Sequence, residues 1–141
     1  MNAIFITVRS NSSRLSNKCY KKIKDKHVIE YVIDQTKKSK FADSIILCTT
    51  KLPEDDLLCE IAAKNNINFF RGSEIDKLDR WYGACKEFNV EFFVTADGDD
   101  LLCEPELCDL AFEQYDNNNS EFIQGDGLIC GSFTYGVKYT A

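Results

Sequence analysis

Short apolar segments of the chain alternate with segments whose apolar residues recur at helical spacing. The apolar segments are Ala3 to Val8, Ser44 to Cys48, Asn68 to Phe70, Phe92 to Thr95 and Phe122 to Ile123. Apolar runs without polar alternation are typical of strands that are covered on both faces. The helical spacing lies between them, at Val28 to Ile33, Leu57 to Ala62, Leu78 to Cys85 and Leu107 to Ala111. The order β-α-β-α-β-α-β-α-β requires crossover connections, so it predicts an α/β fold with a mostly parallel sheet and helices on both faces.

The segment from Gly125 to Ala141 has a different character, because it holds four of the seven glycines. Within it, Ser132 to Tyr139 predicts a hairpin or an edge strand. A chain of 141 residues with 44% hydrophobic content suits one globular domain. We therefore expect residues 1–141 to form a single domain, and the abrupt end after Thr140 predicts that this domain is truncated at its C-terminal side.

Charge is distributed unevenly along the chain. The formal net charge of -6 argues against a nucleic-acid partner, which requires clustered lysines and arginines. The first forty residues nevertheless hold more than half of the 17 lysines and arginines, while the rest of the chain is acidic. This distribution predicts a small anionic ligand near the N-terminal part of the chain.

The cysteines and the single histidine are expected to be structural. The seven cysteines are odd in number and include no C-x-x-C pair, so we expect buried thiols in a reducing cytoplasm. His27 precedes a predicted helix, where a structural role is expected. No apolar stretch approaches the ~20 residues that a membrane-spanning helix needs.

Two polar loops follow predicted strands. In an open parallel sheet, ligands bind beyond the C-terminal ends of the strands, where such loops meet. The loops are Arg9 to Lys18 and Asp97 to Asp100. The first combines three cations with several hydroxyls, as phosphate oxygens require, but it lacks the Walker A pattern. From the residues alone, a merely solvated loop is the alternative.

The first loop resembles a known motif. Its pattern, Arg9-x-x-Ser12-Ser13-Arg14-Leu15-x-x-Lys18, is similar to the R-x-x-S-[ST]-R-L-P-G-K loop of the cytidylyltransferases that make CMP-activated acidic sugars. That family includes CMP-deoxyoctulosonate synthetases and spore-coat polysaccharide cytidylyltransferase-like proteins. The resemblance implies that the loop wraps the phosphates of CTP and that the nucleotide is bound by Arg9, Ser12, Ser13, Arg14 and Lys18.

Two segments depart from the family pattern. Ser16-Asn17 stands where the family has Pro-Gly, although Asn tolerates the left-handed conformation that Gly often supplies. Leu101 replaces a proline in the acidic loop, where Thr95 to Pro105 resembles T-G-D-x-P-L-[IL]-x-[DE]-P. The resemblance implies that Asp99 binds a divalent cation, and we expect Asp97 to assist. Carboxylate oxygens suit Mg²⁺; a plain acidic turn is the alternative.

Two further segments resemble the same family. Thr49-Thr50, followed by Pro53 to Asp56, is similar to T-T-x-x-P-E-D-D. Thr49 and Thr50 end a predicted strand and are candidate nucleotide ligands, whereas Asp55 and Asp56 suit the N-terminus of a helix.

The run from Phe70 to Tyr82 resembles F-R-G-S-x-x-D-x-L-x-R-[YF]-Y. The resemblance places Arg71, Ser73 and Arg80 near the base or phosphates, and Ser73 is also a candidate helix cap. The helical spacing of Leu78, Trp81 and Tyr82 predicts core packing.

Taken together, the resemblance implies a Rossmann-like domain of the nucleotide-diphospho-sugar transferase type over residues 1–141. It implies CTP-dependent transfer of CMP to a small polar acceptor, an acidic sugar, with release of pyrophosphate and with Mg²⁺ as cofactor. Arg9, Lys18 and Asp99 are the candidate catalytic residues, and a homodimer is expected. One alternative takes Asp97-Gly98-Asp99 as the D-x-D of a metal-dependent glycosyltransferase. Another is a catalytically incomplete nucleotide-binding module.

Overall fold

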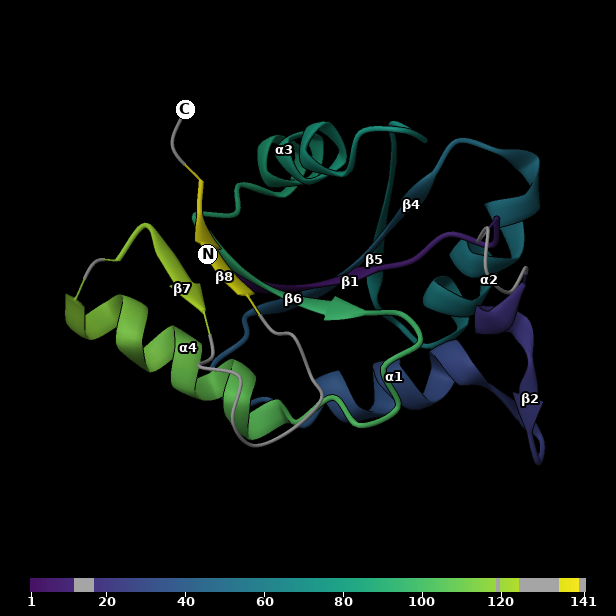
Figure 1. Cartoon of the computed structure of the whole chain (residues 1–141), viewed down its shortest axis with the longest axis horizontal. Coiled ribbons are helices and arrows are strands. Elements are labelled where there is room, and N and C mark those ends of the chain that lie inside the picture. Colours follow the sequence, from purple (N-terminus) through teal and green to yellow (C-terminus); the bar gives the residue numbers. More distant parts are fainter. Residues whose placement is uncertain (12–16, 119, 125–134, 140–141) are drawn as a thin grey trace.

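The computed structural model describes residues 1–11, 17–118, 120–124 and 135–139. Six strands form its main sheet in the order β5-β4-β1-β6-β8-β7 (Figure 1). In chain order these strands are β1 (Asn2–Thr7), β4 (Ser44–Thr50), β5 (Asn68–Gly72), β6 (Phe92–Asp97), β7 (Phe122–Gln124) and β8 (Tyr135–Lys138). The helices are α1 (Val28–Thr36), α2 (Asp56–Lys64), α3 (Lys77–Phe88) and α4 (Pro105–Asn118).

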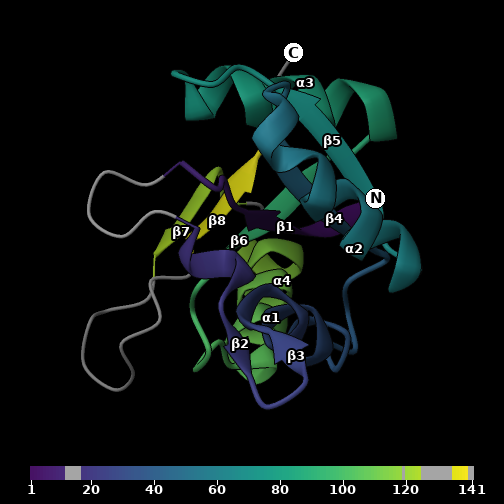
Figure 2. The same ribbon diagram turned by 90° about the vertical axis from the view of Figure 1, so that its right-hand side faces the viewer.

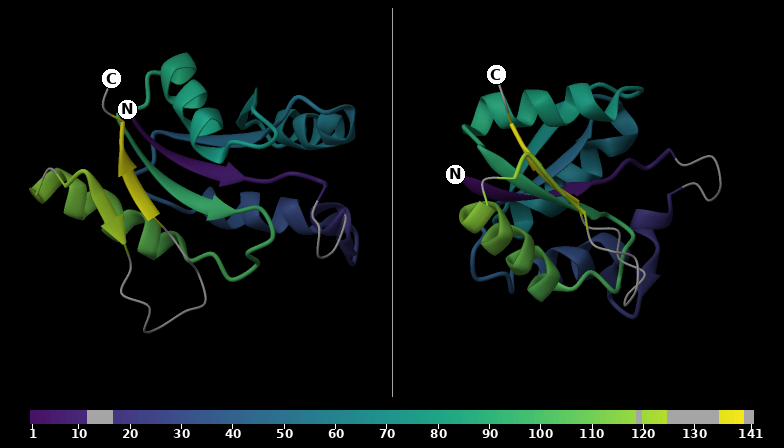
Figure 3. Two further views of the ribbon diagram at one scale, coloured as in Figure 1. Left: turned by 45° about the horizontal axis from the view of Figure 1, so that its top comes forward. Right: turned by 60° about the vertical axis from the view of Figure 1, so that its left-hand side comes forward.

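The predicted parallel sheet is confirmed. β1 lies between β4 and β6 and runs parallel to both, and β5 extends the parallel set beside β4. The C-terminal strand β8 pairs antiparallel with β6 and with β7 (Figure 3). The sequence predicted a hairpin or an edge strand over Ser132 to Tyr139. Among the described residues this run contributes one strand, β8, which lies inside the sheet, so the edge prediction is wrong and β7 forms the edge.

Helices cover both faces of the sheet, as the continuous apolar runs predict. Figure 1 shows α3 on one side of the sheet and α1 and α4 on the other. Alternate residues of β1 serve the two faces: Ile4 and Ile6 pack with buried residues of α1, α2 and α4, while Ala3 and Phe5 pack with those of α3. All four side chains are fully buried.

A small ribbon that the sequence did not predict lies in the cationic segment. Its strands, β2 (Lys22–Ile23) and β3 (Lys26–His27), pair antiparallel beside α1 (Figure 2). Two-residue strands carry no apolar run, so periodicity cannot reveal them. His27 ends the ribbon and begins α1, where its N–H donates to Oε2 of Glu30 at 2.9 Å. This contact gives the histidine a structural position.

The cysteines of the described ranges are free and buried, namely Cys19, Cys48, Cys59, Cys85, Cys103 and Cys108. Burial raises the pKa of Cys85 to about 12, which keeps this thiol protonated and unreactive. Across the described ranges, none of the helices has the length and apolar character to cross a membrane.

Candidate functional site

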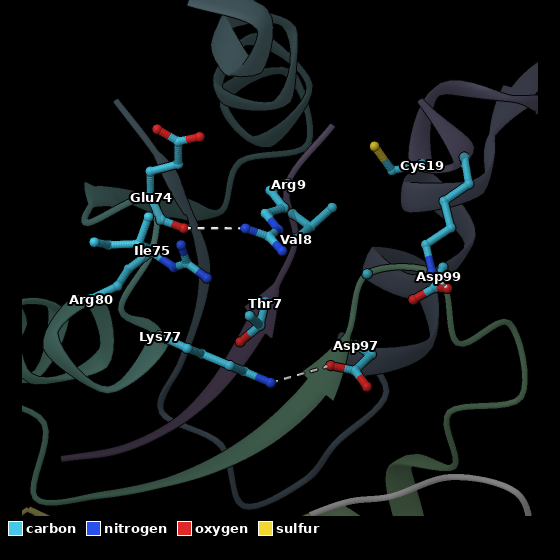
Figure 4. A pocket seen from close by; sticks show the side chains of 12 residues that line it. Thr7, Val8, Arg9, Cys19, Glu74, Ile75, Lys77, Arg80, Asp97 and Asp99 are labelled. Atoms are coloured by element: carbon cyan, nitrogen blue, oxygen red, sulfur yellow. Dashed lines mark hydrogen bonds and ion pairs between the residues drawn. The ribbon is translucent and has the colours of Figure 1, made fainter. Parts of the chain in front are cut away.

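A polar pocket of about 400 Å³ opens at the carboxyl ends of β1 and β6 (Figure 4). Loops after these two strands contribute to it, together with the segment before and at the start of α3. The lining residues are Thr7, Val8, Arg9, Lys18, Cys19, Glu74, Ile75, Lys77, Arg80, Asp97, Gly98 and Asp99. The pocket therefore lies at the edge of the sheet where parallel strands are expected to bind ligands.

The two loops singled out in the sequence meet in this pocket. Nζ of Lys18 forms an ion pair with Oδ2 of Asp99. Their side chains are 31% and 38% exposed, so a ligand can reach both. Lys18 begins the short 3-10 helix η1 (Lys18–Tyr20) after the first loop. The structure thus brings a cation from one loop and a carboxylate from the other to a single point.

Lys77 forms a second cationic contact in the pocket, and the sequence analysis missed it. Its Nζ lies 3.7 Å from Oδ1 of Asp97. The same Nζ lies 4.7 Å from the centre of the Trp81 ring, whose Nε1 donates to Oγ1 of Thr7 at 2.8 Å. A usable signal was present, because Lys77 is the first residue of a helix that follows a parallel strand. Such helix starts lie at the ligand-binding edge of the sheet.

Two arginines enter the pocket without a carboxylate partner among the described residues. Arg9 donates from Nη1 to the carbonyl oxygen of Glu74 at 3.3 Å, and Arg80 donates from Nη1 to that of Ser73 at 2.7 Å. Arg80 is only 4% exposed, and its Nε has no partner in the described part of the chain. Burial lowers the pKa of Arg80, and the charge of Arg9 acts in the same direction. Two guanidinium groups held only by neutral carbonyls favour an anionic ligand.

Arg71 and Ser73 lie outside this lining. Arg71 donates to the carbonyl oxygens of Thr50 and Leu52 at 2.8 and 2.7 Å, and its Nη1 lies 2.6 Å from Oδ1 of Asp56. The guanidinium group of Arg71 therefore joins β5 to the start of α2. The Ser73 hydroxyl accepts from the N–H of Asp76 at 3.1 Å.

The residue that caps α3 is Asp76. Its carboxylate accepts from the backbone N–H groups of Leu78 and Asp79 at 2.9 and 3.0 Å. Ser73 was expected as the cap, but it lies too far before Lys77, the first helical residue, for its oxygen to reach the free N–H groups of the first turn.

Thr49 and Thr50 are fully buried and face Asp55. Their hydroxyls donate to Oδ2 of Asp55 at 2.9 and 2.5 Å. Oδ1 of Asp55 accepts from the backbone N–H and the hydroxyl of Ser10 at 2.8 and 2.6 Å. This cluster fixes the first loop where it leaves β1. The two threonines support the pocket from behind and do not line it.

Asp55 is a buried hydrogen-bond acceptor and not a solvated helix charge. It is 1% exposed and ends the 3-10 helix η2 (Pro53–Asp55) directly before α2. Burial raises the pKa of this carboxyl, but the hydrogen bonds from Ser10, Thr50 and Thr49 outweigh burial and hold the pKa below its ordinary value. The sequence could not show this, because a helix-start aspartate looks the same whether it faces solvent or a neighbouring loop.

Part of the first loop lies outside the described residues, including Ser12, Ser13 and Arg14. Asn17, which replaces the glycine of the family pattern, has a φ of 56° and is left-handed, as expected. Its N–H donates to the carbonyl oxygen of Ser10 at 2.9 Å. The two ends of the loop are thus held together.

An apolar groove of about 540 Å³ lies beside α3 and β8. Leu78, Trp81 and Tyr82 line it, with Phe122 and Tyr139. Core packing was predicted for the three α3 residues, but Leu78 is 70% and Tyr82 is 48% exposed. The buried face of α3 is formed by Arg80, Ala84 and Cys85. Trp81 is partly buried and packs against the core cluster that contains Ala84 and Cys85. Core packing is therefore confirmed for Trp81 and wrong for Leu78 and Tyr82.

Comparison with known proteins assigns the chain to a family. A family model described as cytidylyltransferase matches residues 3–138. The chain belongs to the cytidylyltransferase family. Its sequence is 37% identical over 126 residues to the uncharacterized protein MJ1063 of Methanocaldococcus jannaschii, covering 89% of this chain and 52% of that protein. It is 24% identical over 133 residues to the spore coat polysaccharide biosynthesis protein SpsF of Bacillus subtilis, covering 89% of this chain and 55% of SpsF.

A solved structure supports the same assignment. The cytidylyltransferase of Leptospira borgpetersenii superposes with a TM-score of 0.90 at 28% identity, covering 97% of this chain and 60% of that one. The chain therefore shares the fold of that structure over 97% of its own length. It spans about half the length of the curated relatives that it matches.

Proposed function

We propose that this cytidylyltransferase transfers CMP from CTP to a small acceptor, an acidic sugar, and releases pyrophosphate. The observation that carries the proposal is the meeting of Lys18 and Asp99 in one pocket. Transfer of a nucleotidyl group needs positive charge on the departing phosphates and a carboxylate for the metal, both within reach of one triphosphate.

The cations of the pocket suit the triphosphate. Arg9 and Lys18 come from the two ends of the first loop and both line the pocket. They would bind the β and γ phosphates and stabilise the charge that develops as pyrophosphate departs. Arg80 also lines the pocket, and its guanidinium has no carboxylate partner among the described residues. Charge-assisted hydrogen bonds from such a group to phosphate oxygens are among the strong ones. Ser12, Ser13 and Arg14 are proposed to complete the phosphate contacts.

The carboxylates of the pocket fit Mg²⁺. In the described ranges, no cluster of three or more His, Cys, Asp or Glu could hold a metal unaided. Mg²⁺ does not need such a cluster, because it commonly takes one or two carboxylates, several waters and the phosphates of the substrate. Asp97 and Asp99 line the pocket on either side of Gly98. Bound there, Mg²⁺ would neutralise charge on the phosphates.

In the proposed reaction, a hydroxyl oxygen of the acceptor attacks the α-phosphorus of CTP. The new bond joins this oxygen to the α-phosphorus, the bond from the α-phosphorus to the bridging oxygen of the β-phosphate breaks, and the proton of the hydroxyl passes to water as pyrophosphate leaves. The protein would act by position and charge, because Arg9 and Lys18 would hold the departing pyrophosphate and Asp97 and Asp99 would hold the metal. Such positioning accounts for most of the catalysis in phosphoryl-type transfer.

Calorimetry with CTP and Mg²⁺, together with an assay for pyrophosphate, tests the proposal. The expected result is Mg²⁺-dependent binding of CTP and acceptor-dependent release of pyrophosphate. Binding without release would identify an incomplete nucleotide-binding module. Failure to bind CTP, with release of a nucleoside diphosphate from a nucleotide sugar, would instead support the glycosyltransferase alternative.

A further inference from the structure

We propose that Lys77 binds the negatively charged group of the acidic acceptor and thereby selects it. The inference rests on the proposed transfer of CMP and adds the residue that selects the acceptor. Lys77 lies at the boundary of two surfaces. Lys77 lines the polar pocket, whereas its neighbour Leu78 and the ring beneath it, Trp81, line the apolar groove.

The position of the Lys77 ammonium is fixed by three elements. It lies over the Trp81 ring of its own helix. That ring is held by its hydrogen bond to Thr7 at the end of β1 and by contact with Phe93 of β6, with the ring centres 5.4 Å apart. Thr7 is paired in register with Asp97, to which the ammonium points. A lysine supported in this way is preorganised, which lowers the entropy cost of binding.

The ammonium still has hydrogen-bonding capacity. Its 3.7 Å separation from Asp97 is longer than a hydrogen bond, and the described residues offer Lys77 Nζ no other acceptor. An ammonium carries three N–H donors. The side chain is 46% exposed and faces the pocket. An anionic oxygen of a ligand could therefore accept from Lys77 without displacing any hydrogen bond of the protein.

The geometry of the proposed transfer reaction gives Lys77 a different role from that of the phosphate-binding cations. In an in-line transfer, the attacking oxygen and the departing pyrophosphate lie on opposite sides of the phosphorus. Figure 4 shows Asp97 between Lys77 and Asp99, and Lys18 contacts Asp99. If Lys18 holds the pyrophosphate, the acceptor must approach the phosphorus from the opposite side, where Lys77 lies. A carboxylate on the acceptor would meet Lys77 there.

The test compares Lys77→Met with Lys86→Met. Lys86 is a matched control, because it lies on the same helix with its ammonium 5.4 Å from the Tyr82 ring centre but does not line the polar pocket. Each protein is titrated with CTP and Mg²⁺. Pyrophosphate release is then measured with a panel of sugar acids, deoxyoctulosonic acid among them, and with the same sugars after reduction of the carboxyl to an alcohol.

We expect Lys77→Met to raise KM for the acids by about tenfold or more, the effect of losing one charge-assisted hydrogen bond. Its affinity for CTP and its KM for the reduced sugars should match those of the wild type and of Lys86→Met. An unchanged KM for the acids would overturn the inference, as would a wild-type preference for the reduced sugars or no release with any acid. Weaker binding of CTP in Lys77→Met would make Lys77 a phosphate ligand instead. If the wild type fails to bind CTP, the proposed function itself is wrong.

Discussion

Lys18 and Asp99 form an ion pair across the pocket, although 81 positions separate them in the sequence. The contact exists because β1 and β6 are hydrogen-bonded neighbours that run in the same direction. Their carboxyl ends therefore coincide, and the loops that follow them begin side by side. A triphosphate that touches one loop is within reach of the other.

Asp99→Ala is expected to abolish Mg²⁺-dependent transfer while leaving the fold intact. Loss of a group that stabilises the transition state costs on the order of 10²-fold or more in rate. An ion pair this exposed contributes at most about 1 kcal/mol to stability. Pyrophosphate release and thermal melting measure the two effects. Asp34→Ala is the control, since Asp34 pairs with Lys26 at comparable exposure away from the pocket. Retained transfer in Asp99→Ala would refute the role of this carboxylate.

Asp55→Asn should destabilise the protein by about 2 kcal/mol or more, because one acceptor oxygen becomes a donor facing buried donors. The effect should depend on pH. The pKa of Asp55 lies below its ordinary value of 3.8 in the folded protein. Its contribution is therefore complete above that value and is lost as the pH falls through the lower, folded-state pKa. Denaturant unfolding at pH 7 and at pH 3 measures the change.

Asp56→Asn is the control for this experiment, because Asp56 follows Asp55 directly but has a 58% exposed side chain. Its effect on the free energy of unfolding should stay within about 1 kcal/mol. Equal effects of the two substitutions, or an Asp55→Asn effect that grows as the pH falls, would contradict the role of Asp55 as a buried, ionised acceptor.

Gly98→Ala should impair both stability and transfer. A Cβ at this position would lie 2.5 Å from Cβ of Val8 and 2.7 Å from its Cγ2. Because Val8 is buried, the backbone between Asp97 and Asp99 must move, and overpacking of this kind costs roughly 1–3 kcal/mol. Thermal melting and the KM for Mg²⁺ would record the two effects. If the Gly98→Ala protein is destabilised but keeps a normal KM for Mg²⁺, then Gly98 is needed for packing against Val8 and not for the metal site.

Arg80→Met should weaken CTP binding by about tenfold, the effect of one lost charge-assisted hydrogen bond. The free energy of unfolding should hardly fall. A buried guanidinium without a carboxylate partner is costly to desolvate, and Met has a similar length without the charge. Calorimetry and denaturant unfolding measure the two effects. A large loss of stability with normal CTP affinity would show that Arg80 serves the core and not the ligand.

The sequence predicted the architecture well because the spacing of apolar residues depends on which faces of a strand or helix are buried. Apolar runs at β1, β4 and β6 gave the parallel strands, and their order placed two polar loops at one edge. β2 and β3 were missed because they lack an apolar run. The edge position expected for β8 was wrong, because its interior place depends on pairing with both β6 and β7, which no local pattern encodes.

As expected from the strand ends, the pocket is lined by Arg9, Asp97 and Asp99. Their binding and catalytic roles stay predictions. Prediction failed to locate residues whose orientation depends on tertiary contacts. Thr49 and Thr50 end a strand as expected, yet their hydroxyls face Asp55. Lys77 was missed because its approach to Asp97 depends on the Trp81 ring beneath it. The Ser12, Ser13 and Arg14 contacts stay predictions.

Because β8 lies between β6 and β7, a nascent chain emerging from the ribosome cannot complete its sheet in the order of synthesis. The outer edge of β6 stays unpaired until residues 135–138 have been made, and β7 has no strand to join before then. A strand whose backbone N–H and C=O groups are unpaired along one edge is a template for intermolecular pairing. Translational pausing before these residues would therefore lengthen the interval in which the outer edge of β6 is open to intermolecular pairing.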